Sequence, residues 1–336
     1  MNSLRVCAVV PAYKVIKHIC QVIDGLRPFV EHVFVVDDAC PDGSGEYLRA
    51  SSSFDVKFVS ILILPVNQGV GGAVLAGYEA ALKQGFDILV KVDGDGQMDP
   101  TFIPSLVFPI ESGEADYTKG NRFFDPEMLT QMPVVRLIGN AGLSLVTKLS
   151  TGYWHIMDPT NGFTAIHAKL IPWIHPEKIE KRYFFESDVL YRLGLIGGVI
   201  QDVPMPARYG DEVSNLSIRN ALFNFGGLHV IRLAKRIFYN YFLRGFSIGS
   251  LFLLLSIPMI CFGVGYGIVE WHRSIVTGVF ASTGKIMISV MPTLIGVQML
   301  LSFLNLDMSK PVSKPFWVRV SNPKLKITAT KGRDNI

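Results

Sequence analysis

The stretch Leu89-Val90-Lys91-Val92-Asp93-Gly94-Asp95-Gly96-Gln97 joins an apolar run to a tight acidic turn. The Val, Ile and Leu residues of 87–92 favour a β-strand, and the two glycines let the backbone turn sharply after it. Ligands of open α/β sheets bind beyond the carboxyl ends of the strands. Carboxylates one residue apart repel each other unless a cation lies between them, and a hard divalent cation that also binds phosphates fits such a place. The alternative is a solvated Asp-Gly turn.

Strands and helices alternate around this stretch. Apolar runs at 5–10, 31–36 and 56–64 precede it, and helical periodicity covers 18–26 and 73–82. This alternation predicts an α/β fold with a doubly wound, mostly parallel sheet. Three of the runs end in Pro11-Ala12-Tyr13, Asp37-Asp38 and Asp93-Gly94-Asp95, so we expect these polar turns at one edge of the sheet. The shared edge favours a ligand site over a chance turn.

The second half of the globular region carries weaker signals of the same kind. Strands are expected at 116–120 and 198–203, helices at 136–149 and 184–192, and an apolar run lies at 163–166. A turn rich in Asp, Pro, Asn and Gly at 157–163 and a polar loop at 208–217 connect them. These elements extend the predicted sheet.

The composition excludes some classes of function. Of the 336 residues, 49% are hydrophobic and only 18% are charged, and the apolar excess lies toward the C-terminal end. The net charge of +4 is too small and too scattered to indicate nucleic-acid binding. The four cysteines have no metal or redox spacing, so we expect them to be reduced and buried in a cytosol-facing protein. No apolar segment precedes Arg5, and we expect no export signal.

A change in composition after residue 217 predicts a membrane anchor. Apolar residues of 230–241 share one helical face and Arg232, Lys235 and Arg236 the other. This pattern is typical of a helix in a membrane interface, although an ordinary surface helix is the alternative. Two charge-free runs follow at 246–269 and 286–306, each long enough to cross a bilayer core of about 30 Å, unless they are buried core helices.

The expected organisation is a globular domain (1–217), a juxtamembrane amphipathic helix (218–244), two transmembrane helices with a short external loop (245–308) and a basic tail (309–336). Basic residues cluster at 232–244 and 310–319, whereas the loop between the spans holds only Arg273 and Lys285 as cations. By the positive-inside rule both ends are cytoplasmic. We therefore expect a multi-pass protein of the cytoplasmic (inner) membrane, with its globular domain in the cytosol and a flexible tail that can touch anionic headgroups.

Seven short motifs, in this order and spacing, resemble those of family 2 inverting glycosyltransferases. The closer resemblance is to the polyprenyl-phosphate branch, which includes the dolichyl-phosphate mannose synthases. The motifs are Val9-Val10-Pro11-Ala12-Tyr13, Val35-Val36-Asp37-Asp38, Asn67-Gln68-Gly69-Val70-Gly71-Gly72-Ala73, Asp93-Gly94-Asp95-Gly96-Gln97, Gly120-Asn121-Arg122-Phe123, Thr160-Asn161-Gly162-Phe163 and Phe185-Glu186. The resemblance covers residues 6–217, and the two apolar runs extend it. It implies a sheet of the nucleotide-diphospho-sugar transferase type.

The resemblance also implies a metal-dependent reaction. In this family the acidic turn holds the metal, so Asp93, Asp95 and Gln97 are candidate ligands of Mg²⁺ or Mn²⁺. The cation acts as a Lewis acid on the departing nucleoside diphosphate.

Further donor contacts are expected at the neighbouring strand ends. Asp38 resembles the family's carboxylate that meets the nucleotide, and Pro11 and Tyr13 resemble the wall beside the base. A cap on the following turn is the alternative for Asp38. Asn67 and Gly69 belong to a loop that resembles a phosphate cradle at a helix N-terminus. A strand-to-helix turn that needs glycine for close packing is the alternative for this loop.

Two residues are candidates for the catalytic step on the acceptor side. Arg122 resembles the family's arginine beside the acceptor phosphate, for which a guanidinium is suited; an ordinary surface arginine is the alternative. Asp158 lies where the family places a carboxylate near the acceptor. It can be a general base for a hydroxyl acceptor, an orienting or metal-contacting group for a phosphate acceptor, or the first residue of an Asp-Pro turn. Glu186 and Arg208 are further candidates of this kind.

The function expected from these features is transfer of a sugar from a nucleoside-diphosphate sugar to a polyprenyl phosphate, with membrane lipids around the anchor and homo-oligomers left open. The first alternative is transfer to a hydroxyl of a lipid-linked glycan in cell-surface polysaccharide synthesis. The positions after Tyr13 and Phe163 depart from the family pattern. That departure keeps a non-catalytic membrane scaffold as a third hypothesis.

Overall fold

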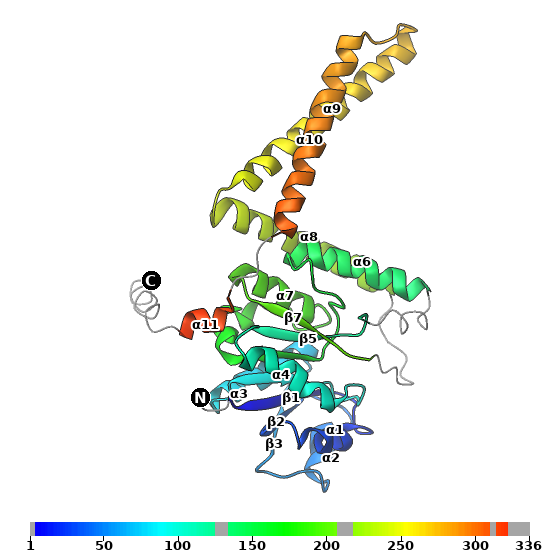
Figure 1. Cartoon of the computed structure of the whole chain (residues 1–336). Helices are drawn as coiled ribbons and strands as arrows, with labels where there is room; N and C mark the ends of the chain where they lie inside the picture. The colour runs from blue at the N-terminus through cyan, green and yellow to red at the C-terminus, as the bar shows by residue number, and fades with distance from the viewer. Residues whose placement is uncertain (1–3, 125–133, 207–217, 310–313, 322–336) are drawn as a thin grey trace. The chain divides into compact units, whose positions relative to one another are not determined.

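The computed structural model describes residues 4–124, 134–206, 218–309 and 314–321 (Figure 1). It divides into two compact units, each with its own contacts. The first unit comprises the chain up to Arg232 together with the segment from Val312 onward, and the second comprises Leu233–Pro311. The first unit is therefore discontinuous in sequence, and the domain boundaries expected from composition stay predictions.

A seven-stranded sheet forms the centre of the first unit, with strand order β3-β2-β1-β4-β6-β5-β7. The strands are β1 (Val6–Ala12), β2 (His32–Asp37), β3 (Val59–Ile63), β4 (Ile88–Lys91), β5 (Tyr117–Asn121), β6 (Thr164–His167) and β7 (Ile200–Pro204). All pairs are parallel except those that β6 makes with β4 and β5. The predicted α/β class with a mostly parallel, doubly wound sheet is confirmed.

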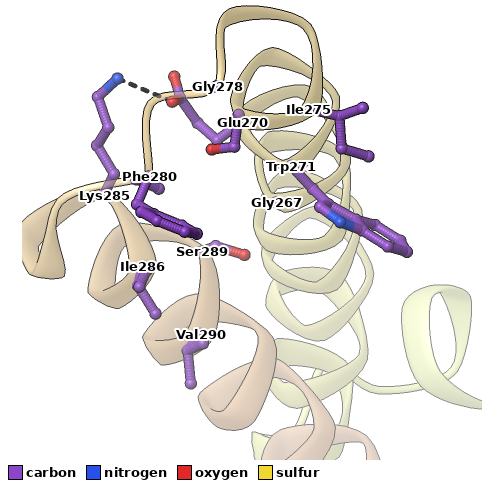
Figure 2. Close-up of a pocket in the computed structure, with 12 residues that line it drawn as sticks. Gly267, Glu270, Trp271, Ile275, Gly278, Phe280, Lys285, Ile286, Ser289 and Val290 are labelled. Carbon is purple, nitrogen blue, oxygen red and sulfur yellow. Dashed lines mark hydrogen bonds and ion pairs between the residues drawn. The ribbon is translucent and has the colours of Figure 1, made fainter.

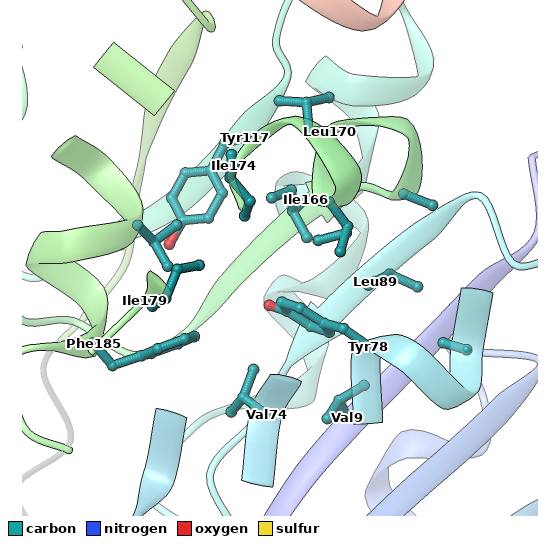
Figure 3. Packing of buried hydrophobic residues seen from close by; sticks show 14 of the residues in the cluster. Val9, Val74, Tyr78, Leu89, Tyr117, Ile166, Leu170, Ile174, Ile179 and Phe185 are labelled. Carbon is teal, nitrogen blue, oxygen red and sulfur yellow. The ribbon is translucent and has the colours of Figure 1, made fainter. Parts of the chain in front are cut away.

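Helices cover both faces of this sheet. On one face lie α1 (Ile19–Leu26), α2 (Ser44–Arg49) and α4 (Ile103–Glu111), and on the other lie α3 (Val70–Lys83) and α7 (Phe185–Ile196). Alternate β1 residues enter the two cores, since Val9 packs with Val74 and Tyr78 of α3 (Figure 3), whereas Ala8 and Val10 pack on the opposite side. Burial on both faces explains why the strands read as continuous apolar runs.

The remaining elements of the first unit are short connectors and two long helices. The connectors are the 3₁₀ turns η1 (Pro100–Phe102), η2 (Ala168–Trp173) and η3 (Pro176–Lys178). The long helices are α6 (Val134–Thr151) and α8 (Ile218–Phe238), and they meet where Ser150 Oγ bonds His229 Nδ1 at 2.8 Å. Helix α8 continues beyond Arg232 into the second unit.

A short C-terminal helix, α11 (Phe316–Ser321), packs on the first unit. The buried Asp116 carboxylate accepts the backbone N–H groups of Phe316 (2.6 Å) and Trp317 (2.8 Å), and the Trp317 ring stacks on His167. The expectation of a flexible tail therefore does not describe these six residues. The aromatic side chains of Phe316 and Trp317 pack on an apolar surface of the sheet domain. The prediction considered only the basic charge of the tail and not these aromatic residues.

The second unit is a helical hairpin made of α9 (Ile248–Thr277) and α10 (Thr283–Met308). Both helices are long and apolar enough to cross a membrane, and only 22% and 11% of their most apolar windows are buried. Small residues line the contact between them, where Ser289 Oγ donates to the Gly263 carbonyl at 2.8 Å. A pocket of about 580 Å³ lies near the connection between the two helices. Figure 2 shows residues that line it, among them the ion pair of Glu270 with Lys285.

The base of the hairpin contains a buried ion pair. Arg236 donates to both oxygens of Asp307 (2.8 and 3.0 Å), and the Tyr241 hydroxyl, from the π-helix η4 (Tyr239–Leu243), donates to the same carboxylate. The pair joins the end of α8 to the end of α10.

The expectation for the cysteines was wrong in part, because Cys7 is buried but Cys261 is exposed.

Candidate active site

The acidic turn lies at the point where the strand order reverses. Strands β1 and β4 are neighbours there, and β2 and β3 extend the sheet to one side while β6, β5 and β7 extend it to the other. A Cβ atom on Gly94 would lie 3.2 Å from the Pro11 carbonyl, so the acidic turn packs directly on the end of β1. Tyr13 follows β1 with 45% of its surface exposed. This crevice is where open α/β sheets bind ligands.

The buried residue Lys91 balances part of the negative charge of the acidic turn. Lys91 ends β4 with 1% exposure, and its ammonium group lies 2.7 Å from Asp93 and 3.3 Å from Glu186. Burial lowers the pKa of Lys91, but the two carboxylates outweigh burial and the net shift is upward, so the lysine stays charged. Burial raises the pKa of the Glu186 carboxyl, an effect that Lys91 opposes.

The loop before β6 approaches the same charges. The antiparallel pairing sets Thr164 opposite Lys91, which brings Gly162 to the acidic turn. A Cβ atom on Gly162 would lie 2.3 Å from Lys91 Nζ and 2.9 Å from Asp93 Oδ2. Only a glycine leaves room for this ion pair, and this explains the glycine of the Asn161-Gly162-Phe163 motif.

Asp93, Asp95 and Gln97 offer oxygen ligands of the type that Mg²⁺ and Mn²⁺ accept. The Asp93 side chain is 31% exposed, and Asp95 Oδ1 accepts the backbone N–H of Gln97 at 3.0 Å. Within the described part of the chain, no three His, Cys, Asp or Glu side chains group as a metal cage. The donor set therefore fits a cation held by one or two carboxylates and completed by substrate phosphates, as is usual for Mg²⁺.

Asp38 and the glycine-rich loop bind each other. The two Asp38 carboxylate oxygens accept the backbone N–H groups of Gln68 (2.7 Å) and Gly69 (2.8 Å), and Asn67 Nδ2 donates to the Asp38 carbonyl (3.2 Å). Three residues predicted to contact the donor, Asp38, Asn67 and Gly69, are thus brought together. Asp38 holds the entry to α3 rather than the turn that follows its own strand.

Two further amides of this loop, those of Gly71 and Gly72, are also engaged. The N–H groups of Gly71 and Gly72 donate to the Lys181 carbonyl at 2.8 and 3.2 Å, and a Cβ atom on Gly69 would lie 2.7 Å from that carbonyl. A phosphate cradle needs amides without a protein acceptor. The geometry therefore favours the alternative of a closely packed strand-to-helix turn, which also fixes the segment that carries Glu186.

The two predicted catalytic residues form an ion pair with each other. Arg122 follows β5, and its Nε and Nη2 donate to the two oxygens of Asp158 at 2.7 and 2.9 Å. Asp158 is fully buried, with a left-handed backbone (φ 47°) that the short Asp side chain tolerates. In this arrangement the Asp158 carboxylate is paired rather than available as a base. Arg208 lies outside the described residues.

A second buried lysine supports this pair. Lys119 in β5 donates to the carbonyls of Met157 (2.7 Å) and Asp158, and lies 3.8 Å from Asp202. Burial lowers the pKa of Lys119, and Asp202 and Asp158 oppose that effect. Neither Lys91 nor Lys119 was identified from the sequence. A charged residue within a predicted buried strand is the signal that could have identified both, because burying an ammonium group requires partners.

Comparison with known proteins gives a consistent result. A family model described as "Glycosyl transferase family 2" matches residues 7–172. The undecaprenyl-phosphate mannosyltransferase of Micrococcus luteus is 31% identical over 205 residues, which cover 60% of this chain and 83% of that protein. The UDP-N-acetylglucosamine–dolichyl-phosphate N-acetylglucosaminyltransferase of Methanococcus voltae is 29% identical, with coverage of 56% and 80%.

Solved structures show the same fold. Glucosyl-3-phosphoglycerate synthase from Mycobacterium tuberculosis, in complex with Mn²⁺, uridine diphosphate and glucosyl-3-phosphoglycerate, aligns with a TM-score of 0.50 at 22% identity. The alignment covers 69% of this chain and 80% of that one. At this identity the likeness establishes the fold alone.

Proposed function

Because this chain belongs to glycosyl transferase family 2 and is a glycosyltransferase, we propose that it transfers a sugar from a nucleoside-diphosphate sugar to a polyprenyl phosphate at the cytoplasmic face of a membrane. The observation that carries the proposal is the acidic turn at the strand-order reversal, in a chain that also contains an apolar helical hairpin. The named relatives of M. luteus and M. voltae act on polyprenyl phosphates, and this supports the same acceptor class here.

Asp93 and Asp95, with Gln97, would hold Mg²⁺ or Mn²⁺ on the donor side. The bound cation would supply Lewis acidity to the leaving diphosphate. Lys91 and Glu186 set the charge around Asp93, and the exposed third of Asp93 gives access from the crevice. Pro11 and Tyr13 border the same crevice and are proposed to contact the base. Asp38 would act on the donor pocket by fixing the loop at Asn67 and Gly69.

The geometry on the acceptor side favours a phosphate over a hydroxyl. A hydroxyl acceptor requires a base, but the Asp158 carboxylate is buried and bonded on both oxygens by Arg122. A lipid phosphate is already ionised at neutral pH and needs no base. Arg122, whose side chain is 32% exposed, is proposed to bind that phosphate, and Asp158 is proposed to orient the guanidinium.

The arrangement of α8 supports docking on a membrane. Arg232 bonds Asp188 within the first unit, and Arg236 bonds Asp307 within the second, so both arginines turn toward protein. The apolar residues Val230, Ile231 and Phe238 are left 64%, 48% and 57% exposed. An apolar face without a protein partner is suited to the acyl boundary of a bilayer. We propose that this helix and the hairpin hold the active site near the lipid headgroups.

The discontinuous first unit supports one orientation for both ends of the hairpin. The chain leaves that unit before α9 and returns to it in α11 after α10. A two-span hairpin brings its ends to the same side of a bilayer. Together with the basic residues that flank the spans, this supports a cytosolic catalytic unit.

The test is an assay of the purified full-length protein in detergent with Mn²⁺ or Mg²⁺, undecaprenyl phosphate and a panel of nucleotide sugars. We expect one donor to give a lipid-linked product that mild acid releases, as a sugar attached through a monophosphate is acid-labile. An acid-stable glycoside, formed only when a lipid-linked glycan is the acceptor, would support the alternative acceptor instead. No product with any donor and acceptor would contradict the proposal.

A further inference from the structure

Burying the charged side chain of Lys91 costs folding free energy that an apolar side chain at this position would not cost. The other residues of β4, Ile88, Leu89 and Val90, are fully buried and apolar, whereas Lys91 brings an ammonium group into the same layer. Burying an unpaired charge is strongly unfavourable, and even a paired one is often no better for stability than a hydrophobic residue. The fold alone therefore does not explain a lysine here.

Three separate segments are arranged around its ammonium group. Asp93 approaches from the acidic turn (2.7 Å), Glu186 from the start of α7 (3.3 Å), and Gly162 from the loop before β6. The Glu186 side chain is 15% exposed and the Lys91 side chain 2%. Lys91, Asp93 and Glu186 together carry two negative charges and one positive charge. They lie next to a turn that also contains Asp95.

This charge balance affects any ligand of the turn. A nucleoside diphosphate is an anion, and two carboxylates without a counter-ion would repel it. A free divalent cation has the opposite preference, because the positive charge of Lys91 repels it and Lys91 already bonds one oxygen of Asp93. At separations of a few ångströms near a protein surface, removing one charge changes the affinity for a charged ligand by a measurable factor.

We propose that Lys91 is a positioning residue that holds Asp93 at the end of β4 and balances Asp93 against Glu186, so that the turn takes up a divalent cation together with a nucleoside diphosphate rather than the cation alone. Lys91 acts through Asp93 and does not itself touch the sugar. The inference rests on the proposed metal-dependent function.

The test measures binding without turnover, by calorimetry on the full-length protein with Mn²⁺ alone and with UDP or GDP as probes. In Lys91→Met we expect Mn²⁺ alone to bind roughly tenfold more tightly and the nucleotide without metal to bind roughly tenfold more weakly. A side chain with a merely structural role would weaken both when it is removed. Lys119→Met is the matched control, because Lys119 is an equally buried lysine that bonds carbonyl groups of the Asp158 loop; we expect its Mn²⁺ affinity to stay near wild type.

The double variant Lys91→Met/Glu186→Gln removes one charge of each sign and should return Mn²⁺ affinity toward the wild-type value. If Lys91→Met fails to fold, Glu186→Gln alone remains decisive, because it removes one of the two negative charges around Lys91 and should weaken Mn²⁺ binding several-fold. If the wild type binds Mn²⁺ and the single variants Lys91→Met and Glu186→Gln bind it with the same affinity, the role of Lys91 is overturned. The metal site of the proposed function is not affected by that result. Absence of Mn²⁺ binding by the wild type, with and without nucleotide, would overturn the metal site of the proposed function and this inference with it.

Discussion

The candidate active site has two sides, the ends of β4 and β5, and each contains a buried lysine with different partners. At the end of β4, the Lys91 ammonium group bonds two carboxylates, and one of them, Asp93, stays 31% exposed. In β5, the Lys119 ammonium group bonds backbone carbonyls of the Asp158 loop, and Arg122 takes the Asp158 carboxylate. The first arrangement keeps charge accessible to a ligand. The second fixes the shape of a loop and leaves its carboxylate fully buried, so ligand chemistry is expected at β4 and acceptor positioning at β5.

The largest effect is expected on the β4 side. Asp95→Ala removes a proposed metal ligand and should lower turnover by roughly 10²–10³-fold while the fold stays intact, because charge stabilisation at a leaving group is worth several kcal/mol. Initial rates and circular dichroism would measure both quantities. Asp99→Ala is the control, because that carboxylate caps η1 through Thr101 and should leave the rate near wild type. Equal rates for Asp95→Ala and wild type would refute the metal assignment.

On the β5 side, the main effect that we expect is a loss of folding stability. Arg122→Ala leaves the Asp158 carboxylate buried without its bidentate partner, which costs about 3–5 kcal/mol in comparable pairs. We expect a clear fall in the melting temperature of the full-length protein in detergent. The double variant Arg122→Ala/Asp158→Asn removes the buried charge and should recover part of the stability without activity. If the single and double variants melt at the same temperature, the ion pair is not what stabilises this loop.

Outside the active-site edge, the docking of α11 gives a reference for purely structural contacts. Asp116→Ala removes the acceptor of three backbone N–H groups, those of Val199, Phe316 and Trp317. An unpaired buried donor costs about 1–3 kcal/mol, so we expect at least about 3 kcal/mol for the three together. Asp116→Asn keeps one carbonyl oxygen and should lose less. Thermal unfolding together with protease release of a C-terminal tag would measure the effect, and an intact, undigested tag in Asp116→Ala would contradict it.

The smallest net effect is expected from pH, because two histidines away from both lysine clusters and several buried carboxyl groups act in opposite directions. Burial lowers the pKa of His167 and of His229 from 6.5 to about 4. Between these values the unfolded chain binds more protons than the folded one, so stability falls as pH drops below 6.5, by about 2 kcal/mol per histidine at pH 5. Burial raises the pKa of Glu186, Asp116 and Asp202, and this acts in the opposite direction.

A single variant separates these contributions. His229→Gln should flatten the dependence of the melting temperature on pH between 7 and 5, because it removes one of the two histidines and leaves the carboxylates in place. Phe184 packs on the His229 ring, so some loss of stability at every pH is expected as well. A slope identical to that of the wild type would show that the pKa of His229 is the same in the folded and the unfolded chain.

Much of the fold could be predicted because local patterns and burial agree. The expected runs at 31–36 and 116–120 correspond to β2 and β5 within a residue, since these strands are apolar or flanked by clear turns. The antiparallel direction of β6 could not be predicted, because a four-residue strand has the same pattern in either direction. Helix α4 was not predicted, because Pro109 lies inside it and a proline in a helix interior weakens the helical signal.

The candidate site was predictable as a set of strand ends but not as a set of contacts. The acidic turn, Asp38 and Arg122 follow the ends of β4, β2 and β5, and a parallel sheet brings these ends to one edge. The pairing of Arg122 with Asp158 and of Asp38 with Gly69 depends on loops between distant elements. Hydrophobic periodicity carries no information about such polar contacts, and the same holds for Lys91 with Glu186.

The position of α11 also bears on how the protein is made. Two of the three backbone donors to the Asp116 carboxylate belong to residues that leave the ribosome after both helices of the hairpin. Until then the sheet domain contains a carboxylate with most of its hydrogen bonds unmade. A chain that stops before Phe316 would leave the Asp116 carboxylate with the Val199 amide but without the other two donors, so the sheet domain is expected to reach its full stability only after the hairpin has been synthesised.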